Sequence, residues 1–514
     1  MKKIFLLILA VYLSIPAFEQ TKKYNIVDFG AKGDGKTLNT ESIQKAIDKV
    51  SIDGGGQLVV PDGNFLTGTL ILKSGVNLFL SPKAVILGST NPYDYPFVKN
   101  ILEKSKNEGR GNHIGALIGA EDQTNLSISG SGTIDGQGRR LSLVLDSLFY
   151  AGVLDSSHYN LRRKRPDARP GDFKFTNCSN LSITGITIKN ASGWVQTYER
   201  CKNLTLDHIR VESDAYWNND GIDVVDCSKV RITNSFVNSA DDGICLKSNG
   251  GGFYNDRIYV ANCTVRSSAS AVKFGTASGG GFRNVVIKDI KVFDTFRSAI
   301  AIESVDGGML ENVLVDGITA TNTGNAIFIR LGHRNKDEHV GTLKNVVIRN
   351  VKVEVPFGRP DEKYDLRGPD LAFFHNIFPS SIVGIPGHPV QNVTLENIQI
   401  TYPGKGNDGL AILPLYRLKD VPEVENQYPE FSMFGELPAW GFYVRHVEGL
   451  TLKNVTVIAK DKDYRPAYVF DDVNGLNMTK CIVKENDKGK QFILNNVTNE
   501  NLAVDKNLIQ KLGQ

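Results

Sequence analysis

The chain lacks the residue patterns that usually mark metal centres. It has 6 cysteines and 8 histidines in 514 residues, with no C-x-x-C pair and no H-x-x-x-H spacing. These absences exclude the common zinc motifs, and we expect no metal and no other cofactor. The net charge is only +3, which excludes the strongly basic balance of a nucleic-acid binder. The partner of the protein therefore has to be inferred from a local site.

Long apolar runs are also scarce. The first follows Lys2 and Lys3 and extends from Ile4 to about Phe18, which is short for a membrane span and is followed by polar sequence. We expect a secretory signal at residues 1–20, no membrane span, and export to the periplasm or the extracellular space. Residues 21–514 are then the mature chain.

A repeated strand pattern fills most of that mature chain. Within each unit the apolar residues alternate, as in Leu181 and Ile183 and again in Ile186 and Ile188. The repeat recurs about every 23 to 33 residues, a spacing typical of a solenoid. We therefore predict an all-β fold, a parallel β-helix with three strands per coil, as a single domain over 21–514. The units start at Asn125, Asn180, Asn203, Lys229, Arg257, Asn284, Asn312, Asn345, Asn392, Gly449 and Gly475.

Other segments depart from the repeat. Residues 39–50 read as a capped amphipathic helix that closes the N-terminal end of the solenoid. Long insertions are expected near 137–175, 356–389 and 402–440. The first insertion carries the basic run Arg162 to Arg165 together with Arg169, which is either a solvated loop or a contact for an acidic polysaccharide.

Cysteines and asparagines recur in register with the coils. Cys178, Cys201 and Cys227 occupy the same place in three consecutive units, three residues before the first apolar residue of a strand. We expect mostly free, stacked thiols, because buried cysteine behaves as a small hydrophobic residue. The repeated asparagines are expected to line turns.

Two acidic motifs stand on successive coils, at residues 218–223 (NNDGID) and 241–247 (DDGICLK). When they are aligned as equivalent rungs, Asp220 falls beside Asp242, and Asp241 brings a third carboxylate to the same patch. Like charges this close force their pKa values apart, which is how a general acid and a general base arise together. The motifs predict a catalytic site.

A turn offers the alternative interpretation, because Asp-Gly pairs are common in turns. It accounts for Asp220 and Asp242, each of which precedes a glycine. It does not account for the extra acid Asp241, nor for Asp223 and Lys247 on the outward face of the following strands. We therefore favour catalysis.

At these motifs the chain resembles glycoside hydrolase family 28, the polygalacturonase family. The resemblance rests on N-T-D-G-x-D at 218–223, on D-D-x-I-x-x-K at 241–247, on the opening segment 27–35 and on the coil repeats. It implies a right-handed parallel β-helix that hydrolyses pectic glycosides with inversion. It also implies that Asp241 is the general acid, while Asp220 and Asp242 position and deprotonate a water. Neighbouring rungs are about 4.8 Å apart, so those two can share one water.

The chain departs from the family at two other motifs. Residues 269–271 read ASA in place of G-H-G, and residues 301–303 read AIE in place of R-I-K. The missing cations predict poor activity on unsubstituted polygalacturonan. Lys273, one coil before Glu303, and Arg330, one coil after it, are expected to contact the sugar instead. The alternative is a surface ion pair between Lys273 and Glu303. The expected substrate-binding residues are Asn218, Asp223, Lys247, Lys273, Glu303, Arg330 and His333.

We therefore predict an inverting, metal-independent glycoside hydrolase that acts on pectin-like polysaccharides or oligosaccharides. Exo action is favoured, because the long insertions can wall off one end of the cleft. One alternative is a polysaccharide lyase on the same fold, which would need Ca²⁺ and a basic residue. The other is a glycan-binding β-helix without activity, which the three aspartates argue against.

Overall fold

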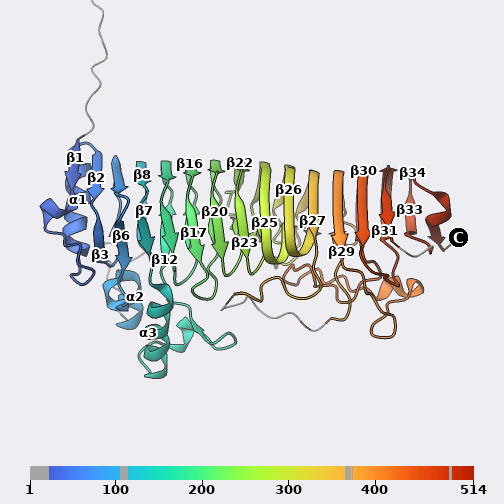
Figure 1. Cartoon of the computed structure of the whole chain (residues 1–514), viewed down its shortest axis with the longest axis horizontal. Coiled ribbons are helices and arrows are strands. Elements are labelled where there is room, and N and C mark those ends of the chain that lie inside the picture. The colour runs from blue at the N-terminus through green and yellow to red at the C-terminus, as the bar shows by residue number, and fades with distance from the viewer. Residues whose placement is uncertain (1–21, 105–113, 365–371, 373, 486–488, 514) are drawn as a thin grey trace, which may run out of the picture.

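The computed structural model describes residues 22–104, 114–364, 372, 374–485 and 489–513; the expected signal at 1–20 lies outside them. The strands coil into one right-handed parallel β-helix, which confirms the predicted fold (Figure 1). Helix α1 (Thr40–Ile52) lies at the N-terminal end and buries Ile43, Ala46, Ile47 and Val50, as predicted for a cap. The side chain of Asn39 does not cap this helix; it bonds the backbone of Lys32 and Thr37 instead.

The early coils build three parallel sheets, one strand of each sheet per turn of the solenoid. The first sheet holds β1 (Lys23–Asn25), β2 (Gly56–Val60), β5 (Val76–Leu80), β8 (Thr124–Gly130), β13 (Ser179–Thr184), β16 (Lys202–Asp207), β19 (Ser228–Thr233) and β22 (Asn255–Ala261). The second holds β3 (Gly63–Thr67), β6 (Ala84–Gly88), β9 (Thr133–Asp135), β14 (Thr187–Lys189), β17 (Arg210–Ser213), β20 (Phe236–Ser239) and β23 (Thr264–Ser267). The third, which we call the site sheet, holds β4 (Leu70–Ile71), β7 (Ala116–Glu121), β12 (Gly171–Thr176), β15 (Gln196–Glu199), β18 (Ile222–Val225), β21 (Ile244–Ser248) and β24 (Val272–Ser278).

Later strands run on around the corners between sheets. They are β25 (Gly281–Ser304), β26 (Met309–Leu331), β27 (Thr342–Glu354), β28 (Ser380–Val383), β29 (Val390–Tyr402), β30 (Phe442–Ala459), β31 (Tyr468–Thr479), β32 (Ile482–Lys484), β33 (Phe492–Thr498), β34 (Asn501–Ala503) and β35 (Ile509–Leu512). The site sheet continues through the ends of β25 and β26 into β28 and the start of β30.

Stacked identical positions form the core and the turns. Leu181, Leu204 and Val230 pair in register and are buried, so each coil covers the apolar face of the next. All six cysteines are free and buried, as predicted, and Cys178, Cys201 and Cys227 precede equivalent strands of successive coils.

The repeated asparagines form a ladder at one corner. Asn203 donates to Asn180, and Asn180 donates to Asn125, with N···O distances of 2.9 and 3.0 Å. Each of the three has φ between 54° and 56°, the left-handed conformation that asparagine tolerates better than most residues. Each of the three lies at the start of a strand, β8, β13 or β16, so they bend the chain within the strand instead of lining a separate turn as predicted. The ladder satisfies side-chain amides from coil to coil.

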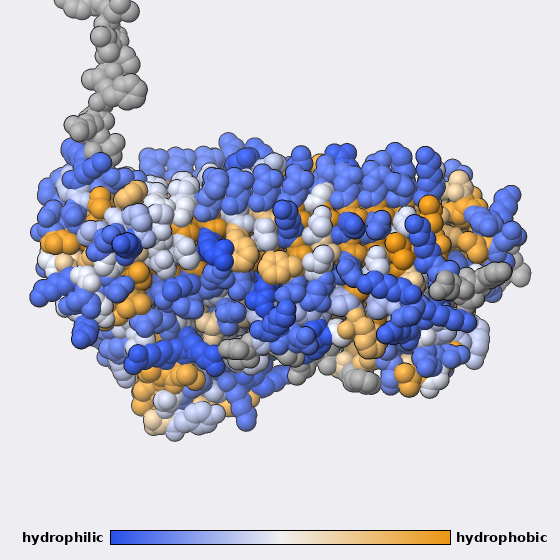
Figure 2. Space-filling view, viewed as in Figure 1, coloured by the Kyte–Doolittle hydropathy of each residue, from blue (hydrophilic) through white to orange (hydrophobic). Residues whose placement is uncertain are grey.

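The insertions gather on one long side of the solenoid (Figure 1). That side carries α2 (Pro96–Leu102), α3 (Gly138–Tyr150) and the two-stranded hairpin of β10 (Tyr159–Asn160) and β11 (Arg165–Pro166). Short 3-10 helices are η1 (Ile26–Phe29), η2 (Pro92–Asp94), η3 (Ser156–His158), η4 (Leu415–Asp420) and η5 (Lys506–Leu508). A hydrophobic patch lies over α3, where Leu143 and Tyr150 are exposed (Figure 2).

Two predicted insertion boundaries need correction. The stretch 137–175 includes most of β12, and 356–389 includes β28; both strands belong to the site sheet. The sequence of β28, SSIV, lacks clear apolar alternation because its outward side chains are buried too. In β12, GDFKFT, the buried Phe173 and Phe175 do alternate with the partly exposed Lys174 and Thr176, but the strand follows the insertion directly.

A second hydrophobic core covers the outward face of the later strands of the site sheet. Residues from 356–440 pack on the outward face of the site sheet from β25 onward. Ala301, Phe328 and Tyr443 point out of the solenoid there and meet Phe431 and Phe434 of the insertion. The outward face is therefore open only over the earlier strands. Among the described residues, no helix has the length and apolar character needed to cross a bilayer.

Candidate active site

Glycines bring the two acidic motifs into register. Ile222 of β18 pairs with Ile244 of β21, so Asp220 lies level with Asp242, as the sequence predicts. A Cβ atom added to Gly221 would meet the Gly243 carbonyl oxygen at 2.6 Å. The glycines are therefore needed for close approach between coils, and they are not merely turn residues.

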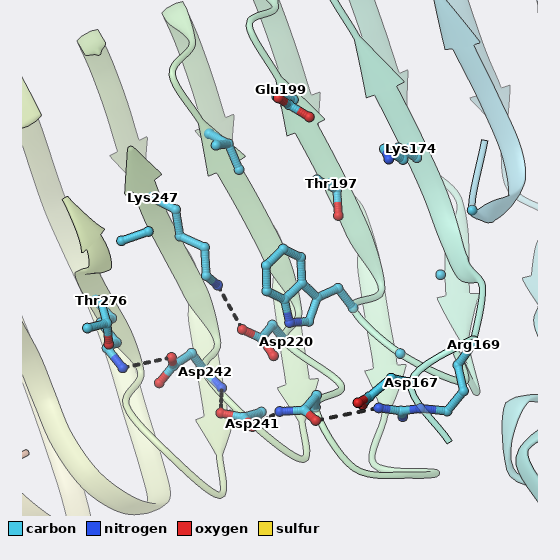
Figure 3. A pocket seen from close by; sticks show the side chains of 18 of the residues that line it. Asp167, Arg169, Lys174, Thr197, Glu199, Asp220, Asp241, Asp242, Lys247 and Thr276 are labelled. Carbon is cyan, nitrogen blue, oxygen red and sulfur yellow. Dashed lines mark hydrogen bonds and ion pairs between the residues drawn. The ribbon is translucent and has the colours of Figure 1, made fainter. Parts of the chain in front are cut away.

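The three aspartates converge on one side of the site sheet (Figure 3). An oxygen of Asp220, an oxygen of Asp242 and the sulfur of Cys245 lie within 4.8 Å of one another. Asp241 Oδ1 accepts from the Asp242 backbone amide at 3.0 Å, and its Oδ2 accepts from Asn218 Nδ2 at 3.2 Å. The pair Asp220 and Asp242 is thus close enough to contact one water, and Asp241 is held beside it.

Lys247 binds the first of these acids from within the wall. Its Nζ donates to Asp220 Oδ2 at 2.8 Å and also to Asp223 Oδ1, and it lies 4.3 Å from the centre of the Trp194 ring. Asp223 is fully buried and does not line the pocket, so the structure gives it the position of an anchor for Lys247. The single ammonium group of Lys247 lies between the carboxylates of Asp220 and Asp223 and cannot neutralise both charges.

Lys273 binds the second acid in the same way. Its Nζ lies 3.1 Å from Asp242 Oδ2 and donates to the hydroxyl of Tyr428 at 2.9 Å. Asp242 Oδ1 accepts from the backbone amide of Ser270 at 3.1 Å, so both of its oxygens are bonded. Ser270 is the serine of the ASA sequence at 269–271, and it contributes its backbone amide to the site.

Arg297 is a site cation that the sequence did not reveal. It is buried, lines the pocket and pairs with Glu430 at 2.6 Å. Tyr428 and Glu430 come from the 402–440 insertion, more than 130 residues further along the chain than Arg297. No local pattern in the sequence marks such distant partners, so the sequence offers no clear signal for Arg297.

Burial and unequal pairing separate the pKa values of the three acids. Burial and the neighbouring Asp242 raise the pKa of Asp241. Burial would raise that of Asp242 too, but Lys273, Lys247 and Arg297 outweigh it and lower the pKa. Burial raises the pKa of Asp220 well above its usual value, against the opposing charge of Lys247. Asp241 is therefore suited to hold a proton beside an ionised Asp242.

The lysines also bear on metal binding. Asp220, Asp242 and Cys245 form a group that has enough ligand atoms for a metal ion. However, the Oδ2 atoms of the two aspartates are already paired with the ammonium groups of Lys247 and Lys273. A cation would have to displace two ammonium groups, so these residues fit a metal poorly.

The aspartates open into a pocket of about 980 Å³. Its wall carries eight cations against six acids, and several of the cations come from the first insertion. Arg162 and Arg163 are exposed on its rim, whereas Arg169 is mostly buried against backbone carbonyls and lies 3.5 Å from Asn218 Oδ1. Part of the basic run therefore lines the pocket, while Arg162 and Arg163 are also exposed to solvent there, so each interpretation describes part of the run.

Besides Asp223, three more of the predicted substrate-binding residues do not line the pocket. Glu303 is buried, and burial raises its pKa to about 8 despite Lys273. Arg330 is fully buried and donates to the carbonyls of Gly384 and Glu423. His333 contacts the carbonyl of Asp337. Lys273 pairs in the ladder with Ala301, not with Glu303, so the expected Lys-Glu-Arg cluster does not form at the pocket.

The alternative interpretation, a surface ion pair between Lys273 and Glu303, is wrong for a related reason. Lys273 and Glu303 point outward, as the alternation predicts, but both are covered and are at most 2 % exposed. Asn218, Lys247 and Lys273 do line the pocket together with the three aspartates.

Comparison with known proteins gives a consistent set of similarities. A family model described as "Glycosyl hydrolases family 28" matches residues 53–364. The chain is 26% identical over 402 residues to a "Probable polygalacturonase" of Vitis vinifera, covering 73% of this chain and 74% of that one. It is 23% identical over 435 residues to an exo-poly-alpha-D-galacturonosidase of Dickeya chrysanthemi, covering 74% and 71%. Among solved structures, the family 28 exopolygalacturonase of Yersinia enterocolitica aligns with a TM-score of 0.65 at 19% identity, over 94% of this chain and 78% of that one, which supports the fold.

Proposed function

The chain belongs to glycosyl hydrolases family 28 and is a glycoside hydrolase, and from that premise we propose that it releases terminal sugars from pectic chains by inverting hydrolysis. The observation that carries the mechanism is the unequal pairing of the three aspartates. Asp242 is bonded at both oxygens and held ionised, while Asp241 beside it has a raised pKa.

In this mechanism Asp241 is the general acid. It gives its proton to the glycosidic oxygen as the bond to the anomeric carbon breaks. Asp242 and Asp220 hold the attacking water between them. Asp220 Oδ1 is buried and has no hydrogen-bond partner among the described residues, so it is the oxygen that takes the proton from the water.

The basic wall supports an anionic substrate. Arg162 and Arg163 are exposed on the rim and form no ion pair with a described residue. With Asp241 protonated, eight cations face five acids in the pocket wall, an excess suited to the carboxylates of uronic acids. The expected weakness on plain polygalacturonan stays a prediction, because Lys273 and Arg297 stand beside the aspartates but are already paired with Asp242 and Glu430.

Release from a chain end is supported by the walls on both sides. The first insertion contributes Arg162 to Arg169 to one side of the pocket, and the 402–440 insertion contributes Tyr428 and Glu430 to the other. Beyond Arg297 the sheet is covered by the second hydrophobic core. The exo-poly-alpha-D-galacturonosidase relative is consistent with this mode of action. Export, which depends on residues 1–20, is part of the same proposal.

Replacing Asp241 with Asn tests the mechanism. We expect kcat to fall about 10²–10⁴-fold, the usual contribution of general acid catalysis, with the melting temperature preserved. Asp461→Asn is a matched control, because this exposed carboxylate lies outside the pocket. Proton NMR of the first product from the unaltered protein should reveal the inverted anomer. Near-normal turnover by Asp241→Asn, or a retained configuration, would contradict the assignment.

A further inference from the structure

One segment of the 402–440 insertion is fastened to the solenoid beside the aspartates. We call residues 423–430 the bridging segment. Backbone and side-chain bonds attach it at four places along its length, and the partners lie on three successive coils of the solenoid. These bonds are Arg330 to the Glu423 carbonyl at 2.7 Å, the His333 amide to the Glu425 carbonyl at 2.8 Å, Lys273 to the Tyr428 hydroxyl at 2.9 Å, and Arg297 to Glu430 at 2.6 Å.

The fit of this segment is close and its backbone is strained. A Cβ atom added to Gly332 would meet the Glu425 carbonyl oxygen at 2.9 Å. Val424 has φ of 43°, a conformation that is unfavourable for a β-branched residue. Strain of this kind persists only where the surroundings fix it, and it concentrates at functional sites. The attachment is therefore specific and is maintained at a cost.

The bridging segment contributes two residues to the pocket wall, Tyr428 and Glu430, and Tyr428 is the exposed one. Its side chain is 50% exposed, although its hydroxyl is bonded to the fully buried Lys273. Trp194 also lines the pocket and has a similar environment: it is 40% exposed, and its ring lies over Lys247. Each aromatic residue thus sits on the lysine that binds one of the two water-holding aspartates, Asp220 or Asp242.

We propose that Tyr428 is a specificity-determining residue, whose ring and hydroxyl form the end wall of the pocket and contact the sugar unit beside the bond that is cut. An aromatic ring offers a flat apolar face, and its hydroxyl adds a polar group that fixes orientation. The buried cations Lys273, Arg297 and Arg330 hold the bridging segment, and thereby Tyr428, in place. This accounts for Arg330 without any contact to the sugar. The inference rests on the proposed hydrolysis of pectic chains.

Tyr428→Ala and Tyr428→Phe test the proposal on oligogalacturonides of defined length. For Tyr428→Ala we expect kcat/KM to fall about tenfold or more, the loss of one good aromatic contact, and the products to include fragments longer than the terminal unit. Tyr428→Phe keeps the ring and should keep the product pattern. Tyr416→Ala is the matched control, because Tyr416 belongs to the same insertion, is 84% exposed and does not line the pocket.

Gly332→Ala tests the position of the bridging segment while the Tyr428 side chain itself is kept. The added methyl group would meet the Glu425 carbonyl oxygen and a methyl group of Val305, both at 2.9 Å, and so disturbs the bridging segment without replacing a pocket residue. We expect the same change of products as in Tyr428→Ala. Melting curves check that each variant is folded. If Tyr428→Ala retains kcat/KM within about twofold, a difference below the contribution of one aromatic contact, the proposal is overturned.

The experiments distinguish a failure of the proposed function from a failure of the proposal for Tyr428. If the unaltered protein cuts within chains from the start, release from chain ends is wrong, and the kcat/KM of Tyr428→Ala still decides the role of Tyr428. If the unaltered protein cleaves other glycans but no pectic oligosaccharide, kcat/KM is measured on the glycan that it cleaves. A large loss in Tyr428→Ala then supports the contact with the sugar, and an unchanged value overturns it.

Discussion

Lys273 offers the sharpest test of the electrostatic argument. It is 1% exposed, and its ammonium group lies 3.1 Å from Asp242 Oδ2. Lys273→Met keeps the apolar stem and removes the charge. Asp242 is then left with Lys247 and Arg297 as the remaining cations that lower its pKa. The substitution therefore weakens the one interaction that most favours an ionised Asp242.

The expected loss of stability follows from breaking a buried pair. Removing one partner typically costs about 3–5 kcal/mol, and the remaining cations place this case near the lower figure. The double variant Lys273→Met with Asp242→Asn removes both charges and should recover part of the loss. Urea denaturation of the unaltered protein, Lys273→Met, Asp242→Asn and the double variant gives the coupling energy between Lys273 and Asp242.

The pH dependence has a definite sign. The folded-state pKa of Asp242 is lowered, so its contribution to stability is present above the ordinary aspartate pKa and is lost as the pH falls through the folded value. The folded-state pKa of Lys273 is raised, so this lysine keeps its charge over the whole range. The deficit of Lys273→Met is thus largest between about pH 4 and pH 10 and shrinks in acid. In activity, the acidic limb of the kcat/KM profile moves to higher pH.

Lys174→Met is the matched control. Lys174 lies on β12 in the same outward row, lines the pocket, and forms no ion pair with a described residue. Its loss should cost about 0.5 kcal/mol or less, as at ordinary surface sites, and leave the acidic limb in place. If Lys273→Met unfolds within about 1 kcal/mol of the unaltered protein and keeps its acidic limb, the pairing argument is refuted.

Two further predictions use other parts of the molecule. Replacing Arg162 and Arg163 together with Gln should raise KM for oligogalacturonides about two- to tenfold without changing kcat, and the difference should disappear at about 1 M salt. An unchanged KM at low salt would argue against a substrate role for this rim. Gly221→Ala should destabilise the protein by about 1–3 kcal/mol, because the new methyl group meets the Gly243 carbonyl at 2.6 Å. Gly193→Ala is its control, since the nearest atom there is 3.7 Å away.

The predictable part of the fold is the part that repeats. A coil buries its apolar alternation against identical neighbours, so the same pattern returns in the sequence wherever the same contact returns in space. For the same reason the register of Asp220 with Asp242 can be predicted from their motifs alone. The ladder of Asn125, Asn180 and Asn203 follows the same rule.

The insertions have no such repeat, and their contacts could not be predicted. Tyr428 and Lys273 are 155 residues apart and meet once in the fold. Arg330 shows the consequence. The alternation correctly placed it on the outward face, but outward does not mean solvent-exposed where the second hydrophobic core covers the sheet. A residue expected to bind sugar therefore binds the backbone of an insertion.

The same cover surrounds residues 301–303, where the chain has AIE in place of the family motif R-I-K. Ala301 faces the second hydrophobic core, where an arginine would be buried without room for its charge. The charge is supplied instead by Lys273, whose ladder partner is Ala301 itself, and by Arg297 on the same strand as Ala301. Adjacent rungs are only about 4.8 Å apart, so a side chain on either rung can reach the same carboxylate. In a solenoid, a missing cation in one motif does not mean a missing cation in the site, and substrate preference has to be argued from the assembled wall of the pocket.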